Sequence, residues 1–378
     1  MEIRSNYSFD KYLTSLYSRK IITLKRLGFM KFLSRLLLLT TAISPIPSLA
    51  ALGEHPIILI HGFQAGQLQT QPMHDEVIAD GKNYWQDFWL SKADERIDWP
   101  SQERVAGKIS TDYVWPKLKA LSKSNTCQNG CILVTHSTGD LVARYLLDNQ
   151  ENWLKNAGLT PLNIIATFDF AGAGGGSELG DLAINISEGN GYLNAPLKYA
   201  MTKWLGEVPS PQNTGVLNDL KVANARQLAP LPDNRIPRIR FVGKGSDYFG
   251  STSGFLPGKD DGVVASHSSC GSSQSGEFTS CSASISFDGK IEPQSQAVTS
   301  FMPYHYPLLM GDDYSHSGLI GTSHQGKVTA VNQQKTLLDG TVIQVNTTDS
   351  TYWLNGSTYR YVDKSDNETM SELVSELL

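Results

Sequence analysis

The sequence predicts an α/β fold with a mostly parallel central sheet. Four short apolar segments have the composition of strands buried on both faces, and they span residues 55–60, 132–134, 162–168 and 239–243. Helical periodicity occurs between them, at 83–89 and 111–124. Because strands that alternate with helices build parallel sheets, ligands are expected at the carboxyl ends of the strands.

The second of these strands leads into a sharp turn with a serine at its apex. The turn reads Thr135-His-Ser-Thr-Gly139, and a helical run with apolar residues on one side follows it. A turn between strand and helix lifts the serine clear of the sheet edge, where a base can reach its hydroxyl. The spacing is Gly-x-Ser-x-Gly with Thr135 at the first glycine position, so the pattern predicts that Ser137 is a nucleophile.

Length and composition are those of an ordinary globular protein. The 378 residues are 40% apolar and 18% charged, with a net charge of −5, and they suffice for one or two domains. This acidic balance gives no reason to expect nucleic acid as a partner.

The first 51 residues have the pattern of an export signal. Basic residues precede an apolar run at 36–43, and a small-residue cleavage site follows at Ser48-x-Ala50. The run is too short to span a bilayer, and Met30 would begin a signal of ordinary length. We expect cleavage near Ala50 and a chain that is either released from the cell or kept in the periplasm; an uncleaved anchor is the alternative.

Export would allow the four cysteines to form two disulfides. Pairing of sequence neighbours, Cys127 with Cys131 and Cys270 with Cys281, is the expected one of three connectivities. Metal binding is the rival interpretation, but the cysteine spacing does not suggest a cluster of ligands.

A serine nucleophile needs an imidazole that takes its proton and a carboxylate that orients the imidazole. In α/β-hydrolases the order along the chain is serine, acid, histidine, and Asp261 and His316 continue that order after Ser137. Asp169, at the end of the next strand, is the alternative acid. Three other histidines compete with His316: His267, His305 and His324.

Two histidines lie beside the predicted machinery. His61 follows the first strand, and we expect it to support the neighbouring loop rather than to take part in the chemistry. His136 directly precedes Ser137, and we expect it to pack.

Three blocks of the chain together resemble the α/β-hydrolase lipases, and most closely the secreted bacterial triacylglycerol lipases. Residues 57–63 resemble the strand and His-Gly element of their oxyanion hole, and 135–145 resemble their nucleophile turn and helix. Residues 261–270 and 312–316 resemble their acid and histidine loops. The resemblance covers roughly residues 55–325.

The resemblance implies a role for each matching residue. Ser137 would attack the ester carbonyl, His316 would act as general base and then acid, and Asp261 would orient the histidine. The N–H groups of Phe63 and Thr138 would bind the oxyanion. The chain lacks, after His316, the Asp and Gln ligands of the structural calcium in those lipases, so we expect no metal and no cofactor.

About 70 residues separate the third and fourth predicted strands, more than a simple crossover needs. We therefore expect an insertion over the sheet edge at about 172–236. Four apolar residues recur in it at helical spacing, as in a core helix or in a lid whose apolar face borders the substrate. They are Leu197, Met201, Trp204 and Leu205.

The end of the chain changes character at about residue 328. Turn dipeptides at Asp339-Gly340 and Asn355-Gly356 separate β-prone runs, and 352–362 is predicted to form a hairpin. The predicted organisation is a hydrolase domain over 52–327 and a small β-rich extension over 328–378, for surface binding, packing or secretion.

The sequence thus predicts an exported carboxylic ester hydrolase, a lipase or lipolytic esterase, that acts on esters at a lipid–water interface. A lipid acyltransferase or a polyester depolymerase would use the same residues. A secreted binding protein on a hydrolase fold is the non-enzymatic alternative. Acyl-chain preference, a helper for secretion or folding, and the oligomeric state are left open by the sequence.

Overall fold

A computed structural model describes residues 53, 55–189, 194–212, 214–229 and 236–377 of the chain. The predicted signal segment lies outside these residues. Within the described ranges, no helix combines the length and the apolarity that a bilayer span requires.

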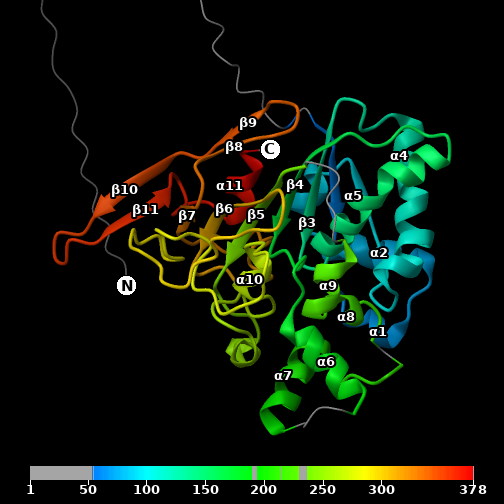
Figure 1. Ribbon diagram of the computed structural model, residues 1–378, viewed down its shortest axis with the longest axis horizontal. Coiled ribbons are helices and arrows are strands. Elements are labelled where there is room, and N and C mark those ends of the chain that lie inside the picture. The colour runs from blue at the N-terminus through cyan, green and yellow to red at the C-terminus, as the bar shows by residue number, and fades with distance from the viewer. Residues whose placement is uncertain (1–52, 54, 190–193, 213, 230–235, 378) are drawn as a thin grey trace, which may run out of the picture. The chain divides into compact units, whose positions relative to one another are not determined.

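A seven-stranded sheet with the order β2-β1-β3-β4-β5-β6-β7 forms the centre of the described chain (Figure 1). Every neighbouring pair is parallel except the last, in which β7 runs antiparallel to β6. The strands are β1 (Ile57–Ile60), β2 (Glu95–Ile97), β3 (Cys131–His136), β4 (Ile164–Phe170), β5 (Arg238–Gly243), β6 (His305–Gly311) and β7 (Val328–Ala330). This strand order, with β3 near the middle, is that of the α/β-hydrolase fold and confirms the predicted fold class.

The central strands are apolar because helices cover both faces of the sheet. Alternate residues of β1 point to opposite sides: Ile58 and Ile60 pack in one hydrophobic cluster, and Ile57 and Leu59 pack in the other. All four side chains are buried. A strand buried on both faces has no polar side, which is why the sequence shows runs rather than alternation.

The helices before the insertion differ from the prediction in one place. They are α1 (Gln67–Thr70), α2 (His74–Tyr84), α3 (Asp87–Lys92), the wide-turned η2 (Val105–Val114), α4 (Trp115–Ser124) and α5 (Gly139–Asn156). The helix predicted over 83–89 is wrong, because Trp85 and Gln86 are extended and separate α2 from α3. The helix predicted from residue 111 continues from η2 into α4, and Pro116 lies in the first turn of α4, where the wide turns of η2 give way to regular α-helix.

The insertion forms four helices that lie together at the lower side of the molecule in Figure 1. They are α6 (Glu178–Ser187), α7 (Ala195–Leu205), α8 (Leu217–Leu220) and α9 (Val222–Leu228). Two of these helices have a side-chain N-cap. The Ser177 hydroxyl caps α6 by accepting from the Leu179 N–H, and the Asn194 side chain caps α7 by accepting from the Leu197 N–H.

The C-terminal segment is joined to the main core. Its first strand, β7, belongs to the central sheet, and the last helix, α11 (Met370–Ser375), buries Met370, Leu373 and Val374 in the same cluster as Leu59. Two small hairpins lie between them, β8 (Gln334–Thr336) with β9 (Val342–Gln344) and β10 (Thr347–Thr351) with β11 (Thr358–Val362). The tip of the second hairpin exposes Tyr352, Trp353 and Leu354, with Trp353 88% exposed.

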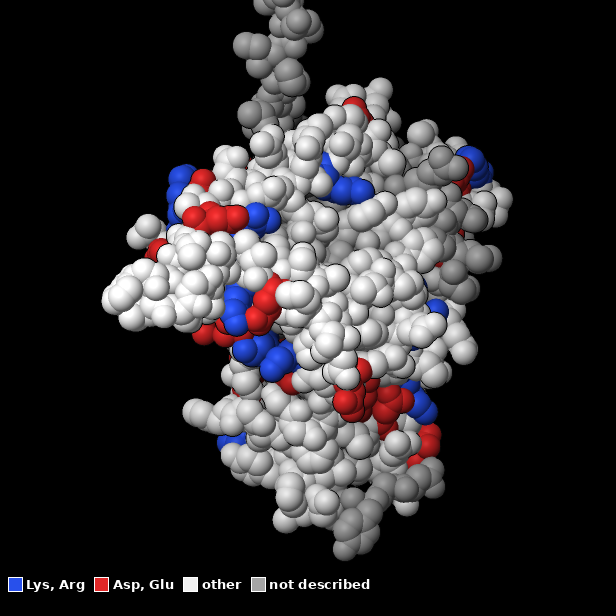
Figure 2. Space-filling model, turned by 60° about the vertical axis from the view of Figure 1, so that its left-hand side comes forward, with Lys and Arg blue, Asp and Glu red and all other residues white. Residues whose placement is uncertain are grey.

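Both disulfides pair sequence neighbours as predicted, Cys127 with Cys131 and Cys270 with Cys281. The second one closes the loop region after β5, which also holds η3 (Tyr248–Gly250), η4 (Ser253–Phe255) and α10 (Ser266–Ser269). On the face drawn in Figure 2, the described Lys and Arg side chains alternate with Asp and Glu over a mostly uncharged surface.

Candidate active site

Ser137 lies at the apex of the turn between β3 and α5 in a conformation that non-glycine residues rarely adopt. Its φ is 56°, in the left-handed region, and a strained serine at this point is typical of a nucleophile turn. The backbone around it is fixed: the Ser137 N–H donates to the Phe170 carbonyl, and its own carbonyl accepts from the Ala173 N–H at 2.9 Å. The turn is therefore held by the end of β4 and by the segment that follows it.

Two glycines allow the backbone to approach the serine. A Cβ on Gly139 would lie 2.3 Å from the Ile60 carbonyl oxygen, so only glycine lets α5 begin this close to β1. A Cβ on Gly62 would lie 2.7 Å from the Ser137 Cβ. The loop after β1 therefore passes directly against the nucleophile turn.

The loops after β5 and β6 bring Asp261 and His316 together. The Asp261 Oδ2 lies 2.9 Å from the His316 Nδ1, and the His316 N–H donates to the Asp261 carbonyl at 2.8 Å. The Oδ1 of the same carboxylate accepts from the N–H groups of Val263 and Val264. Asp261 is fully buried and His316 is 8% exposed, so the pair is shielded from water.

The surroundings of His316 favour its charged form. Burial lowers the pKa of His316, but the charge and hydrogen bond of Asp261, with a further contribution from Asp247, outweigh it and raise that pKa above 6.5. Because the carboxylate engages Nδ1, the Nε2 atom is the nitrogen left for a second proton transfer.

Ser137 and His316 line the same cavity, which has a volume of about 300 Å³. Its apolar wall includes Phe63, Leu220, Val263 and Ile320. Trp204 of α7 also lines it and packs on Phe63, with ring centroids 5.7 Å apart. The insertion thus borders the cavity. The other three apolar residues of the same helical pattern, Leu197, Met201 and Leu205, are buried with Trp204 in the adjoining hydrophobic cluster and do not line the cavity.

The backbone N–H groups of Phe63 and Thr138 donate no hydrogen bond within the described part of the chain, and both residues line the cavity. His61 supports this loop, as predicted. Its Nε2 accepts from the Trp99 N–H, its Nδ1 donates to the Gly62 carbonyl, and its ring stacks on Trp99. Burial lowers the pKa of His61, so it stays neutral in this role.

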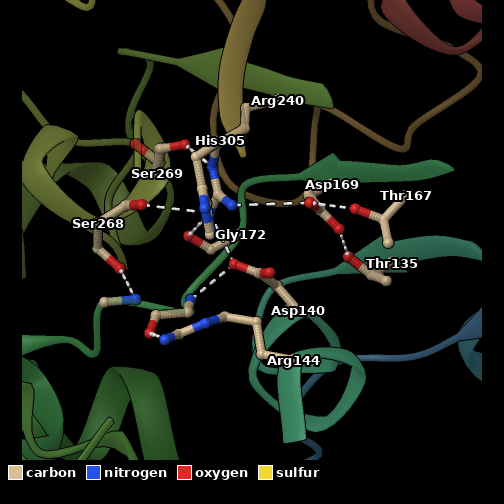
Figure 3. A network of polar contacts seen from close by, with 12 residues as sticks. Thr135, Asp140, Arg144, Thr167, Asp169, Gly172, Arg240, Ser268, Ser269 and His305 are labelled. Carbon is tan, nitrogen blue, oxygen red and sulfur yellow. Dashed lines mark hydrogen bonds and ion pairs between the residues drawn. The ribbon is translucent and has the colours of Figure 1, made fainter. Parts of the chain in front are cut away.

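Asp169, the alternative acid, lies in a separate buried network and lines no part of the cavity (Figure 3). It accepts hydrogen bonds from the hydroxyls of Thr135 and Thr167, each at 2.7 Å, and lies 3.6 Å from an Arg240 nitrogen. Burial and the charge of Asp140 raise the pKa of Asp169 to about 6. The geometry therefore pairs His316 with Asp261, and it explains the threonine at position 135 as a partner of Asp169.

Arg240 is the centre of that network. It is fully buried, and its Nη2 lies 2.6 Å from the Asp140 carboxylate and within hydrogen-bond distance of the carbonyls of Gly172 and Ser268. Its Nε donates to the carbonyl of Ser269. The network therefore joins the first turn of α5, just after Ser137, to the glycine-rich stretch after β4 and to α10.

The competing histidines have other partners. His267 lies 2.7 Å from Glu178 and 2.9 Å from Arg226, His305 bonds the Pro303 carbonyl, and His324 packs on the edge of Tyr314. Only His316 among the described histidines bonds Asp261.

Three residues near the serine were missed by sequence reasoning. Tyr84 at the end of α2 bonds His136, Asp140 pairs with Arg240, and Asp247 accepts from the Ser317 N–H and hydroxyl at 2.9 and 3.0 Å. No local pattern predicts them, since each partner lies at least 50 residues away.

A second cavity of about 400 Å³ lies beside the edge strand β2. Four of its charged residues form two ion pairs, Arg96 with Asp98 and Lys117 with Glu95. Asp94 accepts from the Ile57 N–H, and Asp112 accepts from the Thr111 hydroxyl. No group of three or more His, Cys, Asp or Glu side chains among the described residues could hold a metal ion.

Comparison with known proteins gives structural likeness alone. The chain matches no family model, and no curated protein matches it. It is similar to the Bacillus licheniformis lipase BlEst2 in mature form (15% identity, 70% of this chain and 86% of that one, TM-score 0.39). It is also similar to Staphylococcus hyicus lipase (14% identity, 71% of this chain and 89% of that one, TM-score 0.39). A third similar structure is EstA from Clostridium botulinum (13% identity, 71% of this chain and 83% of that one, TM-score 0.39).

Likeness at this level carries no argument of its own. The strand order and the turn at Ser137 define the chain as an α/β-hydrolase-fold protein.

Proposed function

We propose that this chain is an exported carboxylic ester hydrolase, a lipase or lipolytic esterase, that forms an acyl-enzyme on Ser137. The observation that carries the proposal is the buried Asp261–His316 hydrogen bond at a cavity that Ser137 also lines. The two disulfides support export, because they persist in oxidising compartments.

In the proposed reaction His316 Nε2 takes the proton of the Ser137 hydroxyl while the oxygen attacks the ester carbonyl. The N–H groups of Phe63 and Thr138 bind the oxyanion that forms. His316 then gives its proton to the leaving alcohol as the carbon–oxygen bond breaks. Water, deprotonated by His316, attacks the acyl-enzyme and releases the acid together with free Ser137.

The cavity wall favours uncharged, apolar substrates. Among the described residues that line it there is no Lys or Arg, whereas the carboxylate residue Asp247 is part of the lining. A wall of Phe63, Trp204, Leu220 and Ile320 suits an acyl chain and gives an anionic group no partner. The packing of Trp204 on Phe63 is the contact by which α7 would act as a lid.

Steady-state hydrolysis of p-nitrophenyl butyrate and of emulsified tributyrin tests the proposal. We expect Ser137→Ala to lower kcat at least about 10⁴-fold at unchanged Tm, because the nucleophile is lost. Ser122→Ala is the matched control, since its hydroxyl bonds the Thr160 carbonyl away from the cavity, and it should hydrolyse both esters at the wild-type rate.

Unchanged hydrolysis in Ser137→Ala, or a folded wild-type chain that cleaves neither ester, would refute the proposal. Transfer of the butyryl group to an added alcohol in preference to water would favour the acyltransferase instead.

We also expect kcat/KM to fall at low pH with an apparent pKa above 6.5. The neutral imidazole of His316 is the base, and Asp261 raises its pKa, so protonation inactivates the site at a higher pH than for a free histidine. A profile from pH 5 to 9 measures this. Asp247→Asn should shift the acid limb to lower pH, because it removes a contribution that raises the same pKa; an acid limb below pH 6.5 in the wild type would contradict the assignment.

A further inference from the structure

We infer that Tyr84 and His136 form a positioning relay that ties the oxyanion loop, the nucleophile turn and the loop of His316 together. In this relay the Nε2–H of His136 fixes the backbone of His316 and thereby its imidazole. The inference rests on the proposed function, because it assigns a role to residues that support the same reaction.

The hydrogen bonds of His136 define which group donates and which accepts along the relay. Its Nε2 lies 2.9 Å from the His316 carbonyl oxygen, and a carbonyl can only accept, so Nε2 carries the proton. Its Nδ1 lies 2.5 Å from the Tyr84 hydroxyl, which must then donate. The backbone of Gly62 lies against the Tyr84 oxygen, since a Cβ on Gly62 would be 2.4 Å from it. A continuous chain of donors therefore runs from the Tyr84 hydroxyl, beside the residue before Phe63, to the carbonyl of His316.

The neutral form of His136 is the one that this chain requires. Burial and the neighbouring charge of His316 lower the pKa of His136 well below 6.5. The two rings have centroids 4.8 Å apart, so a protonated His136 would repel the imidazolium that His316 becomes during the reaction. Tyr84 favours the neutral form too, because its hydroxyl needs the lone pair on Nδ1.

Three hydrogen bonds hold His316 in its loop. Its N–H and its Nδ1 both bind Asp261, and its carbonyl is bound by His136. These contacts fix the ring against both the acid and the nucleophile turn, since His136 is the residue directly before Ser137. A displacement of about 1 Å in such an arrangement can cost about 100-fold in rate.

Two substitutions of His136 separate the donor from the bulk of the ring. We expect His136→Leu to lower kcat by about 10- to 100-fold with little change in KM, because the His316 carbonyl loses its donor. His136→Gln keeps an N–H at the reach of Nε2, and it should restore kcat to within about fivefold of wild type. Active sites are counted by fluorophosphonate titration, so that misfolded chains do not enter kcat.

The matched control is His305→Leu. His305 is also buried with a lowered pKa, but it does not line the cavity, so its loss should leave kcat unchanged. If His136→Gln is as slow as His136→Leu, or if His136→Leu keeps the wild-type kcat, the relay is refuted.

A double-mutant cycle with Tyr84→Phe tests the other end of the relay. If Tyr84 acts through His136, Tyr84→Phe should lower kcat severalfold in the wild type and have almost no further effect in the His136→Leu background. Independent, multiplicative losses would overturn the inference.

Histidine ¹⁵N shifts give a readout that stands even if His136→Leu fails to fold or if no ester is hydrolysed. In the wild-type chain His136 should show the neutral Nε2–H form from pH 8 to 5, while His316 titrates above pH 6.5. In Tyr84→Phe the His136 signal should change toward mixed tautomers. A His136 that protonates near pH 6.5 in the wild type would refute the relay, whereas a correct His136 signal in a chain without esterase activity would refute only the proposed function.

Discussion

Asp261→Asn should lower kcat by roughly 10⁴-fold, while Asp169→Asn should leave kcat within about threefold of wild type. Asp261 orients Nδ1 of His316 and stabilises its positive form, and an amide presents the wrong group to that nitrogen. Asp169 contacts Thr135, Thr167 and Arg240 instead. Its loss should appear as a lower Tm, with a cost of about 1–3 kcal/mol for the unsatisfied hydroxyls.

Parallel measurement of kcat and Tm for both variants decides which of the two aspartates is the acid that orients His316. The opposite result, a rate loss in Asp169→Asn at intact stability, would make Asp169 the acid and would require the Asp261–His316 pair to be structural.

Arg240→Met should lower the free energy of unfolding by about 3–5 kcal/mol. The substitution leaves Asp140 as a buried charge without its partner and removes the donors to the Ser268 and Ser269 carbonyls. Urea denaturation with intact disulfides measures the loss. Arg360→Ala is the matched control: its pair with Asp349 lies at the surface, so it should cost less than about 1 kcal/mol.

If Arg240→Met is as stable as the control, the network in Figure 3 contributes no net stability. Its role would then be limited to holding the backbone beside Ser137.

The parts of the site that the sequence predicts are those fixed by local patterns. The turn at Ser137 follows from a buried strand, a serine two residues before a glycine, and a helix. Asp261 and His316 follow from chain order, and two disulfides follow from cysteine spacing. Each signal spans few residues, so it can be identified without knowing what packs against it.

The parts that sequence reasoning missed depend on distant partners. Arg240 occurs in a strand buried on both faces, where a charge is costly, and its partner Asp140 lies 100 residues away. The break between α2 and α3 was missed for the same reason. The sequence pattern over 83–89 is helical, but Trp85 is extended in the structure, and both Trp85 and Trp89 are buried.

The C-terminal segment shows the same limit in its packing. The turn dipeptides mark both hairpins, but the hairpin predicted over 352–362 begins too late, because its first strand is β10 at Thr347–Thr351. Nothing in the strand pattern indicates that β7 joins the main sheet or that α11 packs in the core. A helix of six residues is too short for a repeating apolar pattern to reveal which of its faces is buried. The segment predicted as an extension therefore packs in the main core at both of its ends.

The most direct test of the central claim is the reaction of the disulfide-intact chain with a fluorophosphonate, followed by peptide mapping of the adduct. We expect one adduct per chain, on Ser137, with a labelling rate that rises with pH as His316 loses its proton. The expected adduct is absent in Ser137→Ala and forms much more slowly in His316→Ala. An adduct on another residue, or labelling of Ser137 that is indifferent to the loss of His316, would contradict the account of Ser137 as a nucleophile activated by His316.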